Sequence, residues 1–215
     1  MPDIPPLTTA LWSHEPHERA GRPLLVLLHG YGADERDLFG LRPLLPDEFV
    51  LAAPRAPLGL PWPTPGYSWY PIEGLESRDP SHVTAAASAL HAFIDDVADT
   101  DSVGLLGFSQ GGAIALQAMR LRPERFAFAV NLSGYATPGE LPLDGELARI
   151  RPPVFWGRGS RDDIIPEFLV AHTTEWLPAH SELSGRVYPG LTHSISDQEA
   201  ADVRAFLERR LDGGQ

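Results

Sequence analysis

Short apolar runs, each suited to a single buried strand, recur along this chain and alternate with longer segments of helical periodicity. The runs lie at residues 24–28, 49–53, 103–107, 126–132, 154–157 and 186–188. Continuous apolar runs are typical of strands that are covered on both faces, and such strands are usually parallel. The alternation therefore predicts an α/β fold, with a mostly parallel central sheet and helices on both faces.

Several of the helical segments have recognisable starts. Asp79-Pro80 supplies an N-cap and a first-turn proline for one helix, and a second helix is expected to begin at Pro166. Residues 196–199 have the pattern of a capping box, which predicts the start of a third helix. Residues 8–12 are expected to add an antiparallel edge strand. In a sheet of this kind, functional side chains gather at the carboxyl ends of the strands.

The size and composition fit one globular domain that spans residues 1–215. Of the 215 residues, 43% are hydrophobic, which allows a sizeable core. The formal charge of −12 argues against nucleic acid and anionic membrane surfaces as partners, because both require basic patches. A signal-peptide pattern, a membrane-spanning apolar run and cysteine are all absent. We therefore expect a cytoplasmic protein without membrane insertion, and its oligomeric state stays open, a homodimer included.

The segment Gly107-Phe108-Ser109-Gln110-Gly111 lies where an apolar run meets a stretch of small residues. A serine between glycines at a strand-to-helix junction is typical of the turn that presents a nucleophile. The helix N-terminus beside it favours developing negative charge. A serine at a helix start can also be only a cap, so a catalytic role requires a histidine base and a carboxylate.

Residues that could be these partners lie downstream. Asp162 and Asp163 follow the apolar run 154–157, and His193 follows the run 186–188. Both kinds of group therefore come after a predicted strand, and the order Ser, Asp, His is the one that α/β-hydrolases use. Either aspartate could instead form a local turn.

The apolar run 24–28 ends in His29-Gly30-Tyr31-Gly32, a loop whose glycines let the backbone approach a substrate closely. Backbone N–H groups that stabilise a tetrahedral oxyanion are expected from Tyr31 and from Gln110, the residue after the serine. His29 stands beside these glycines, where we expect it to brace the loop rather than to act as the base.

Four segments resemble the phospholipase/carboxylesterase family of α/β-hydrolases, which includes bacterial carboxylesterases and acyl-protein thioesterases. They are LLHGYGADERDL at 27–38, GFSQGGAIAL at 107–116, DDIIP at 162–166 and GLTHSIS at 190–196. The resemblance implies an α/β-hydrolase fold without a large cap domain. It also implies that Ser109 is the nucleophile, Asp162 rather than Asp163 the acid, and His193 the base. Tyr31 and Gln110 would be the oxyanion donors.

The resemblance weakens in residues 54–71. Family members often have Ser-Trp-Phe-Asp where this chain has Ser68-Trp69-Tyr70-Pro71, so no role of that aspartate can be assigned here. The aromatic residues of this proline-rich loop have two alternative interpretations, a wall of an apolar acyl pocket or a loop packed on the core. They are Trp62, Tyr67, Trp69 and Tyr70.

The sequence contains no recognisable metal or cofactor motif. In residues 14–18, His-Glu-Pro-His-Glu, the histidines are three apart rather than four, and Pro16 is incompatible with the helix of a zinc-binding HExxH motif. A glycine pattern for phosphate or dinucleotide binding is absent as well. We therefore expect no metal and no cofactor.

Together these observations predict a serine hydrolase of carboxylic esters, with thioesters and lysophospholipids as further candidate substrates. The same catalytic residues would serve a peptidase or an acyltransferase, because only the pocket and the acceptor differ. A ligand-binding protein without catalysis is a third interpretation, although such a protein usually lacks part of the catalytic set. The sequence defines neither the acyl-chain length nor the leaving group.

Overall fold

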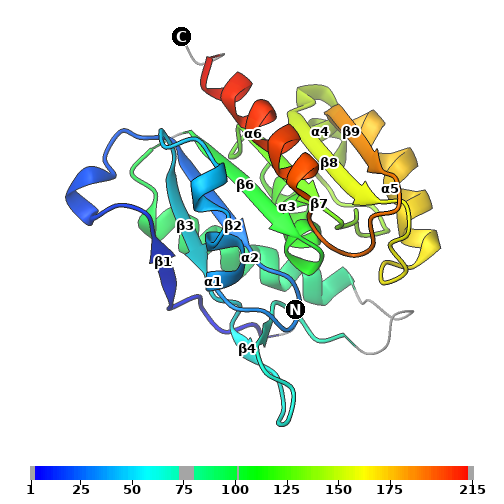
Figure 1. The fold of residues 1–215 in the computed structure, drawn as a ribbon, viewed down its shortest axis with the longest axis horizontal. Coiled ribbons are helices and arrows are strands. Elements are labelled where there is room, and N and C mark those ends of the chain that lie inside the picture. Colours follow the sequence, from blue (N-terminus) through cyan, green and yellow to red (C-terminus); the bar gives the residue numbers. More distant parts are fainter. Residues whose placement is uncertain (1–2, 73–79, 101, 213–215) are drawn as a thin grey trace.

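A computed structural model describes residues 3–72, 80–100 and 102–212. Its centre is a seven-stranded sheet with the order β1-β3-β2-β6-β7-β8-β9 (Figure 1). The strands are β1 (Ala10–Trp12), β2 (Leu24–Leu28), β3 (Val50–Pro54), β6 (Val103–Phe108), β7 (Phe128–Leu132), β8 (Pro153–Gly159) and β9 (Glu182–Tyr188). Neighbouring strands are parallel except β1, which pairs with β3 in antiparallel register. The predicted parallel sheet and its antiparallel edge strand are confirmed.

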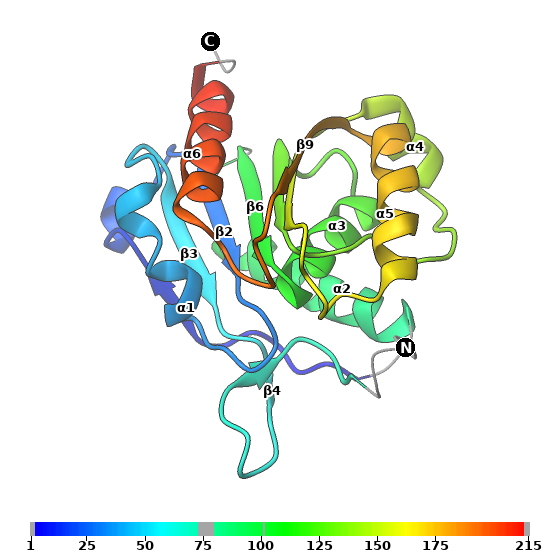
Figure 2. The same cartoon turned by 45° about the vertical axis from the view of Figure 1, so that its right-hand side comes forward.

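Helices cover both faces of this sheet (Figures 1 and 2). They are α1 (Arg36–Phe39), α2 (Pro80–Val97), α3 (Gln110–Leu121), α4 (Asp144–Ile150), α5 (Glu167–His180) and α6 (Asp197–Asp212), with short 3-10 helices at Pro16–Glu18 and Arg42–Leu44. One apolar cluster packs the helices α2, α3, α4 and α5 against one face of the sheet. A second apolar cluster packs α1 and α6 against the other face. No described helix is long and apolar enough to cross a membrane.

The helix starts agree with the sequence where they can be compared. Pro166 directly precedes α5, and α2 begins at Pro80. The N-cap expected at Asp79 lies outside the described residues. At the third start, residues 196–199, only one of the two hydrogen bonds expected for a capping box is present among the described residues.

The strands at the centre and at the edge of the sheet differ in sequence for a physical reason. Every position of β2, β3 and β7 is buried, which explains their continuous apolar runs. In contrast, β9 pairs only with β8, and most of its side chains are partly or fully exposed. Its sequence ELSGRVY therefore has few apolar residues, and only its last residues were predicted as a strand.

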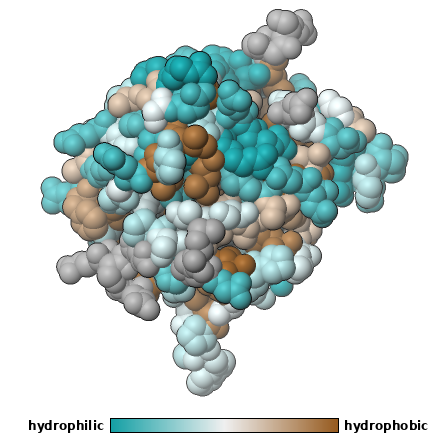
Figure 3. All heavy atoms as spheres, turned by 180° about the vertical axis from the view of Figure 1, so that it is seen from behind, coloured by the Kyte–Doolittle hydropathy of each residue, from teal (hydrophilic) through white to brown (hydrophobic). Residues whose placement is uncertain are grey.

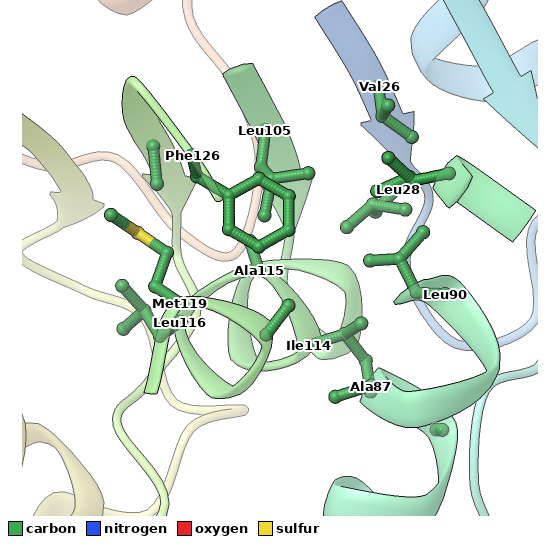
Figure 4. Packing of buried hydrophobic residues seen from close by; sticks show 14 of the residues in the cluster. Val26, Leu28, Ala87, Leu90, Leu105, Ile114, Ala115, Leu116, Met119 and Phe126 are labelled. Carbon is green, nitrogen blue, oxygen red and sulfur yellow. The ribbon is translucent and has the colours of Figure 1, made fainter. Parts of the chain in front are cut away.

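The core between the sheet and its larger helical layer is built from aliphatic side chains. Figure 4 shows Leu90 of α2 and Ile114 of α3 facing Leu28 of β2 and Leu105 of β6. All four side chains are fully buried. Burial of one such side chain stabilises the fold by about 1.5 to 3 kcal/mol. This packing fixes α3, whose first residue follows Ser109, against the sheet.

A hairpin projects from the body of the protein. It consists of β4 (Leu58–Gly59) and β5 (Tyr67–Ser68), and it extends at the bottom of Figures 1 and 2. Figure 3 shows the same projection from behind, with a surface close to neutral in hydropathy. The base of this hairpin pairs with the loop after β2 through a bridge between Ala33 and Tyr67. The hairpin is therefore joined to the loop that carries Tyr31.

The capping box predicted at residues 196–199 is only half formed. Ser196 Oγ accepts a hydrogen bond of 3.2 Å from the Glu199 N–H, as expected. The Glu199 carboxyl, however, turns inward, is fully buried, and has no hydrogen-bond partner among the described residues. It occupies the space beside Gly157 of β8, where a Cβ would lie 2.1 Å from its oxygen. Burial raises the pKa of Glu199 to about 7.

We predict that Glu199→Gln stabilises the protein above neutral pH. In the unfolded chain Glu199 ionises above its ordinary pKa of 4.5, whereas in the folded protein it keeps its proton up to about pH 7. Stability is therefore lost as pH rises through this window, and the glutamine variant avoids a penalty on the order of 2 to 3 kcal/mol. Urea unfolding at pH 5 and pH 8 measures the effect. An equal stability difference at both pH values would contradict the prediction.

Candidate active site

Ser109 lies on a strained turn between β6 and α3. Its backbone has φ 54° and ψ −114°, a region that costs a non-glycine residue about 1 to 3 kcal/mol. The flanking glycines make this turn sterically possible. A Cβ on Gly107 would lie 2.3 Å from the backbone of Gly111, and one on Gly111 would lie 1.9 Å from the Leu28 carbonyl oxygen. The Ser109 N–H also donates to the Leu132 carbonyl of β7 at 2.8 Å, which ties the turn to the sheet.

The structure brings Ser109, His193 and Asp162 into one hydrogen-bonded chain. Ser109 Oγ lies 2.8 Å from His193 Nε2, and His193 Nδ1 lies 2.7 Å from Asp162 Oδ2. Asp162 follows β8, and His193 lies in the loop between β9 and α6. The side chains of Asp162 and His193 are only 5% and 15% exposed. Asp163 is exposed, so the two aspartates are clearly distinguished.

The hydrogen bonds of Asp162 define the state of the histidine. A carboxylate only accepts, so His193 Nδ1 must be the donor, and a neutral imidazole then presents the lone pair of Nε2 to Ser109. The other oxygen, Asp162 Oδ1, accepts from the N–H groups of Ile164 and Ile165 at 3.1 and 3.4 Å. The aspartate therefore forms a local turn and orients the histidine at the same time.

The loop after β2 is held by His29, as the sequence predicts. Its Nε2 accepts from the Ala56 N–H at 3.1 Å, so its Nδ1 donates to the Gly30 carbonyl at 2.8 Å. The side chain is buried, and this burial lowers its pKa. His29 is therefore a structural group that shapes the loop, and both of its ring nitrogens are used in hydrogen bonds to backbone groups.

Two backbone N–H groups, those of Gln110 and Tyr31, have no acceptor among the described residues. Gln110 is the first residue of α3, so its N–H has no acceptor within the helix. Among the described residues, no hydrogen bond uses the N–H of Tyr31, although the neighbouring Gly32 and Ala33 N–H groups are bonded. The side chain of Tyr31 points outward and is 47% exposed. These N–H groups are the two that the sequence suggested as oxyanion donors.

The aromatic residues proposed for an acyl pocket have three different environments. Trp62 is 93% exposed near the tip of the hairpin, Tyr67 is partly buried, and Trp69 and Tyr70 are fully buried in the core. Trp69 Nε1 donates to the His29 carbonyl at 2.8 Å, and the Tyr70 hydroxyl lies 2.5 Å from that of Tyr135. The pocket assignment needs correction for Trp69 and Tyr70, because their polar atoms are used inside the core. A pocket role for Tyr67 stays a prediction.

An ion pair under the hairpin was not recognised from the sequence. Arg55 donates two hydrogen bonds to Glu35, at 2.6 and 2.7 Å, and a third to the Tyr67 hydroxyl at 3.2 Å. The Arg55 guanidinium lowers the pKa of the buried Glu35 carboxyl to about 2. The pair joins the end of β3 to the loop after β2. The two residues are 20 positions apart and lie outside the strands, and no local sequence pattern indicates their pairing.

Within residues 3–72, 80–100 and 102–212, no three His, Asp or Glu side chains are arranged to hold a metal ion. Within the segment 14–18, Pro16–Glu18 form a short 3-10 helix.

The α/β-hydrolase class of protein is defined by a serine on a strand-to-helix turn that is hydrogen-bonded to a histidine, which is itself hydrogen-bonded to an aspartate, with all three groups after parallel strands. The sequence matches the family model described as Phospholipase/Carboxylesterase over residues 14–211, and the chain belongs to this family. The predicted family and fold are confirmed, and in the described residues no large cap domain is inserted. The enzyme class that follows from the family is a hydrolase of carboxylic esters.

Relatives and solved structures agree with this family. The chain is 28% identical over 224 residues to a probable carboxylesterase of Oryza sativa subsp. japonica, covering 90% of this chain and 80% of the relative. It is 25% identical over 223 residues to acyl-protein thioesterase 1 of Cryptococcus neoformans var. neoformans, covering 87% and 92%. The crystal structure of a carboxylesterase from Mesorhizobium loti has a TM-score of 0.77 at 24% identity, covers 94% of this chain and 98% of that chain, and has a similar fold.

We predict that Gly66→Ala lowers ester hydrolysis. Gly66 has φ +88°, and an added Cβ would lie 2.0 Å from the Gly32 carbonyl oxygen, so the loop of Tyr31 must shift. Gly21→Ala is the matched control, since Gly21 has φ +72° but no atom within 4 Å of an added Cβ. We expect kcat/KM to fall about tenfold or more for Gly66→Ala and to change little for the control. Equal rates for both variants would contradict this prediction.

Proposed function

We propose that this protein is a serine carboxylesterase that forms an acyl-enzyme on Ser109. The observation that carries the proposal is the hydrogen-bonded chain from Ser109 Oγ through the imidazole of His193 to the carboxylate of Asp162. A serine hydroxyl is a weak nucleophile until an adjacent base takes its proton. The unprotonated Nε2 of His193 lies within reach of that proton.

In the acylation step, Ser109 Oγ attacks the ester carbonyl while His193 Nε2 accepts the hydroxyl proton. Asp162 keeps Nδ1 protonated and stabilises the imidazolium that forms. His193 then gives the proton to the leaving alkoxide, and the carbonyl–oxygen bond of the ester breaks. In deacylation, water takes the place of the serine hydroxyl, and its attack releases the acid and restores the free Ser109.

The oxyanion of each tetrahedral intermediate would be bound by the N–H groups of Tyr31 and Gln110. Gln110 directly follows Ser109 at the start of α3, and Tyr31 follows Gly30, where an added Cβ would lie 3.6 Å from the Ser109 Cβ. The helix N-terminus adds favourable electrostatics for this negative charge. Loss of one such donor typically costs about 10²- to 10³-fold in kcat.

We propose thioesters and lysophospholipids as further substrates. Support comes from the family description, which includes phospholipases, and from the likeness to a protein named acyl-protein thioesterase 1. A thioester requires the same acyl-enzyme and a thiolate leaving group in place of an alkoxide. Peptidase or acyltransferase activity would use the same residues, and no described contact favours either over hydrolysis of esters.

We expect Ser109→Ala to abolish turnover of an aryl ester while leaving the melting temperature close to that of the wild type. The substitution removes only the hydroxyl, and the N–H bond to Leu132 stays. Labelling by a fluorophosphonate probe, followed by mass spectrometry, should modify Ser109 in the wild type and no residue in the variant. Substantial turnover by Ser109→Ala would overturn the proposed function.

Two neighbouring aspartates provide a second test with a built-in control. Asp162→Asn replaces the carboxylate that accepts the hydrogen bond from His193 Nδ1, so we expect kcat to fall by about 10⁴-fold. Asp163→Asn removes the same charge from an exposed side chain, and we expect kcat to stay within about twofold. Steady-state kinetics of both variants on one ester measure the contrast. Similar losses in the two variants would refute the assignment of Asp162.

A further inference from the structure

The two proposed oxyanion donors come from separate elements of the chain. Tyr31 belongs to a loop after β2, whereas Gln110 begins α3 and is fixed by the helix. An oxyanion hole requires both N–H groups at set positions, because a small misplacement costs transition-state stabilisation. The loop of Tyr31 must therefore be held in a defined position relative to α3.

Residues 67–70, here called the brace, hold this loop on the carboxyl side of Tyr31. The Gly32 N–H donates to the Tyr67 carbonyl at 2.9 Å, and the Tyr67 N–H donates to the Ala33 carbonyl at 2.9 Å. These two bonds form a short antiparallel bridge directly after Tyr31. The brace therefore restrains the peptide groups that follow the proposed donor.

The brace also holds the amino side of the same loop. Trp69 Nε1 donates to the His29 carbonyl at 2.8 Å, and the indole ring lies against the His29 ring with centroids 5.3 Å apart. Trp69 is fully buried, so this bond is shielded from water. Tyr31 is thus enclosed between two segments that the brace fixes.

The side chain of Gln110 fixes the brace in turn. Its Oε1 accepts from the Trp69 N–H at 2.9 Å, and its Nε2 donates to the Tyr70 carbonyl at 2.9 Å and to Ser68 Oγ at 3.1 Å. Gln110 and all three of its partners are buried. One amide group therefore satisfies polar atoms of three consecutive residues.

We propose that the Gln110 side chain is a positioning group for the second oxyanion donor, acting through the brace on Tyr31. This inference rests on the proposed function. Gln110 would then have two separate roles, since its backbone N–H binds the oxyanion and its side chain sets where the Tyr31 N–H lies. The coupling depends on hydrogen bonds rather than on the bulk of the side chains, so a substitution that preserves shape can test it.

The experiment compares Trp69→Phe with Trp156→Phe. Trp69→Phe keeps an aromatic ring but removes the bond to His29. Trp156 is also a buried indole that donates to a backbone carbonyl, that of Gly134 at 3.3 Å, but it has no hydrogen bond to the brace or to the loop of Tyr31. We expect both variants to lose some thermal stability. Only Trp69→Phe should lower kcat, by about tenfold, with KM within about twofold of the wild type.

A transition-state analogue separates positioning from general damage. An alkyl boronic acid forms a tetrahedral adduct on the serine, so its affinity should fall in Trp69→Phe by the same factor as kcat/KM. Gln110→Glu is the second variant, because it keeps the backbone N–H and the chain length but removes the Nε2 donors. It should show the same loss of kcat.

Wild-type kcat in both Trp69→Phe and Gln110→Glu would overturn the inference, as would an equal loss of kcat in Trp156→Phe. Failure of the proposed function is recognised independently, because Ser109→Ala would then retain turnover. If Ser109→Ala is inactive and the brace variants keep wild-type kcat, only the coupling between Gln110 and Tyr31 is refuted.

Discussion

The start of α3 lies in direct backbone contact with the end of β2, and the rest of the site depends on this contact. Hydrogen is the only substituent that fits at Gly111, where a Cβ would overlap the Leu28 carbonyl oxygen. The close approach places Ser109 and Gln110 next to the loop that carries Tyr31. A larger residue at Gly111 would move the helix away from the sheet and separate Ser109 from the loop of Tyr31.

Two buried polar side chains, Gln110 and Glu199, have opposite environments. The Gln110 amide beside Ser109 is paired, with partners at both its oxygen and its nitrogen. Glu199 is buried without a partner among the described residues and its pKa is raised. Paired groups define one geometry, whereas an unpaired carboxyl destabilises the fold once it ionises. The Gln110 amide thus helps to fix the geometry beside Ser109, whereas Glu199 makes the stability of the fold depend on pH.

The sequence predicted those features that leave a local signal. Apolar runs marked the central strands, and Ser109, Asp162 and His193 stood at strand ends in a known order. The family resemblance was needed to choose Asp162 over its neighbour, a choice that fits the observed hydrogen bonds. The links to Gln110 left no such signal, because its bond to Trp69 joins residues 41 positions apart. Likewise, no pattern shows whether a capping glutamate turns back to the helix or into the core.

The order of the proposed catalytic groups along the chain has a consequence for synthesis. Ser109 and the brace precede β8 and β9 in the chain, whereas His193 comes from the loop between β9 and α6. Parallel strands pair only after their crossover segments have been made, so this part of the sheet forms late. Ser109 therefore stays without its histidine while the 84 residues up to His193 are made. Docking of β9 against β8 would bring His193 to Ser109, so that this part of the sheet and the proposed catalytic contact form in the same event.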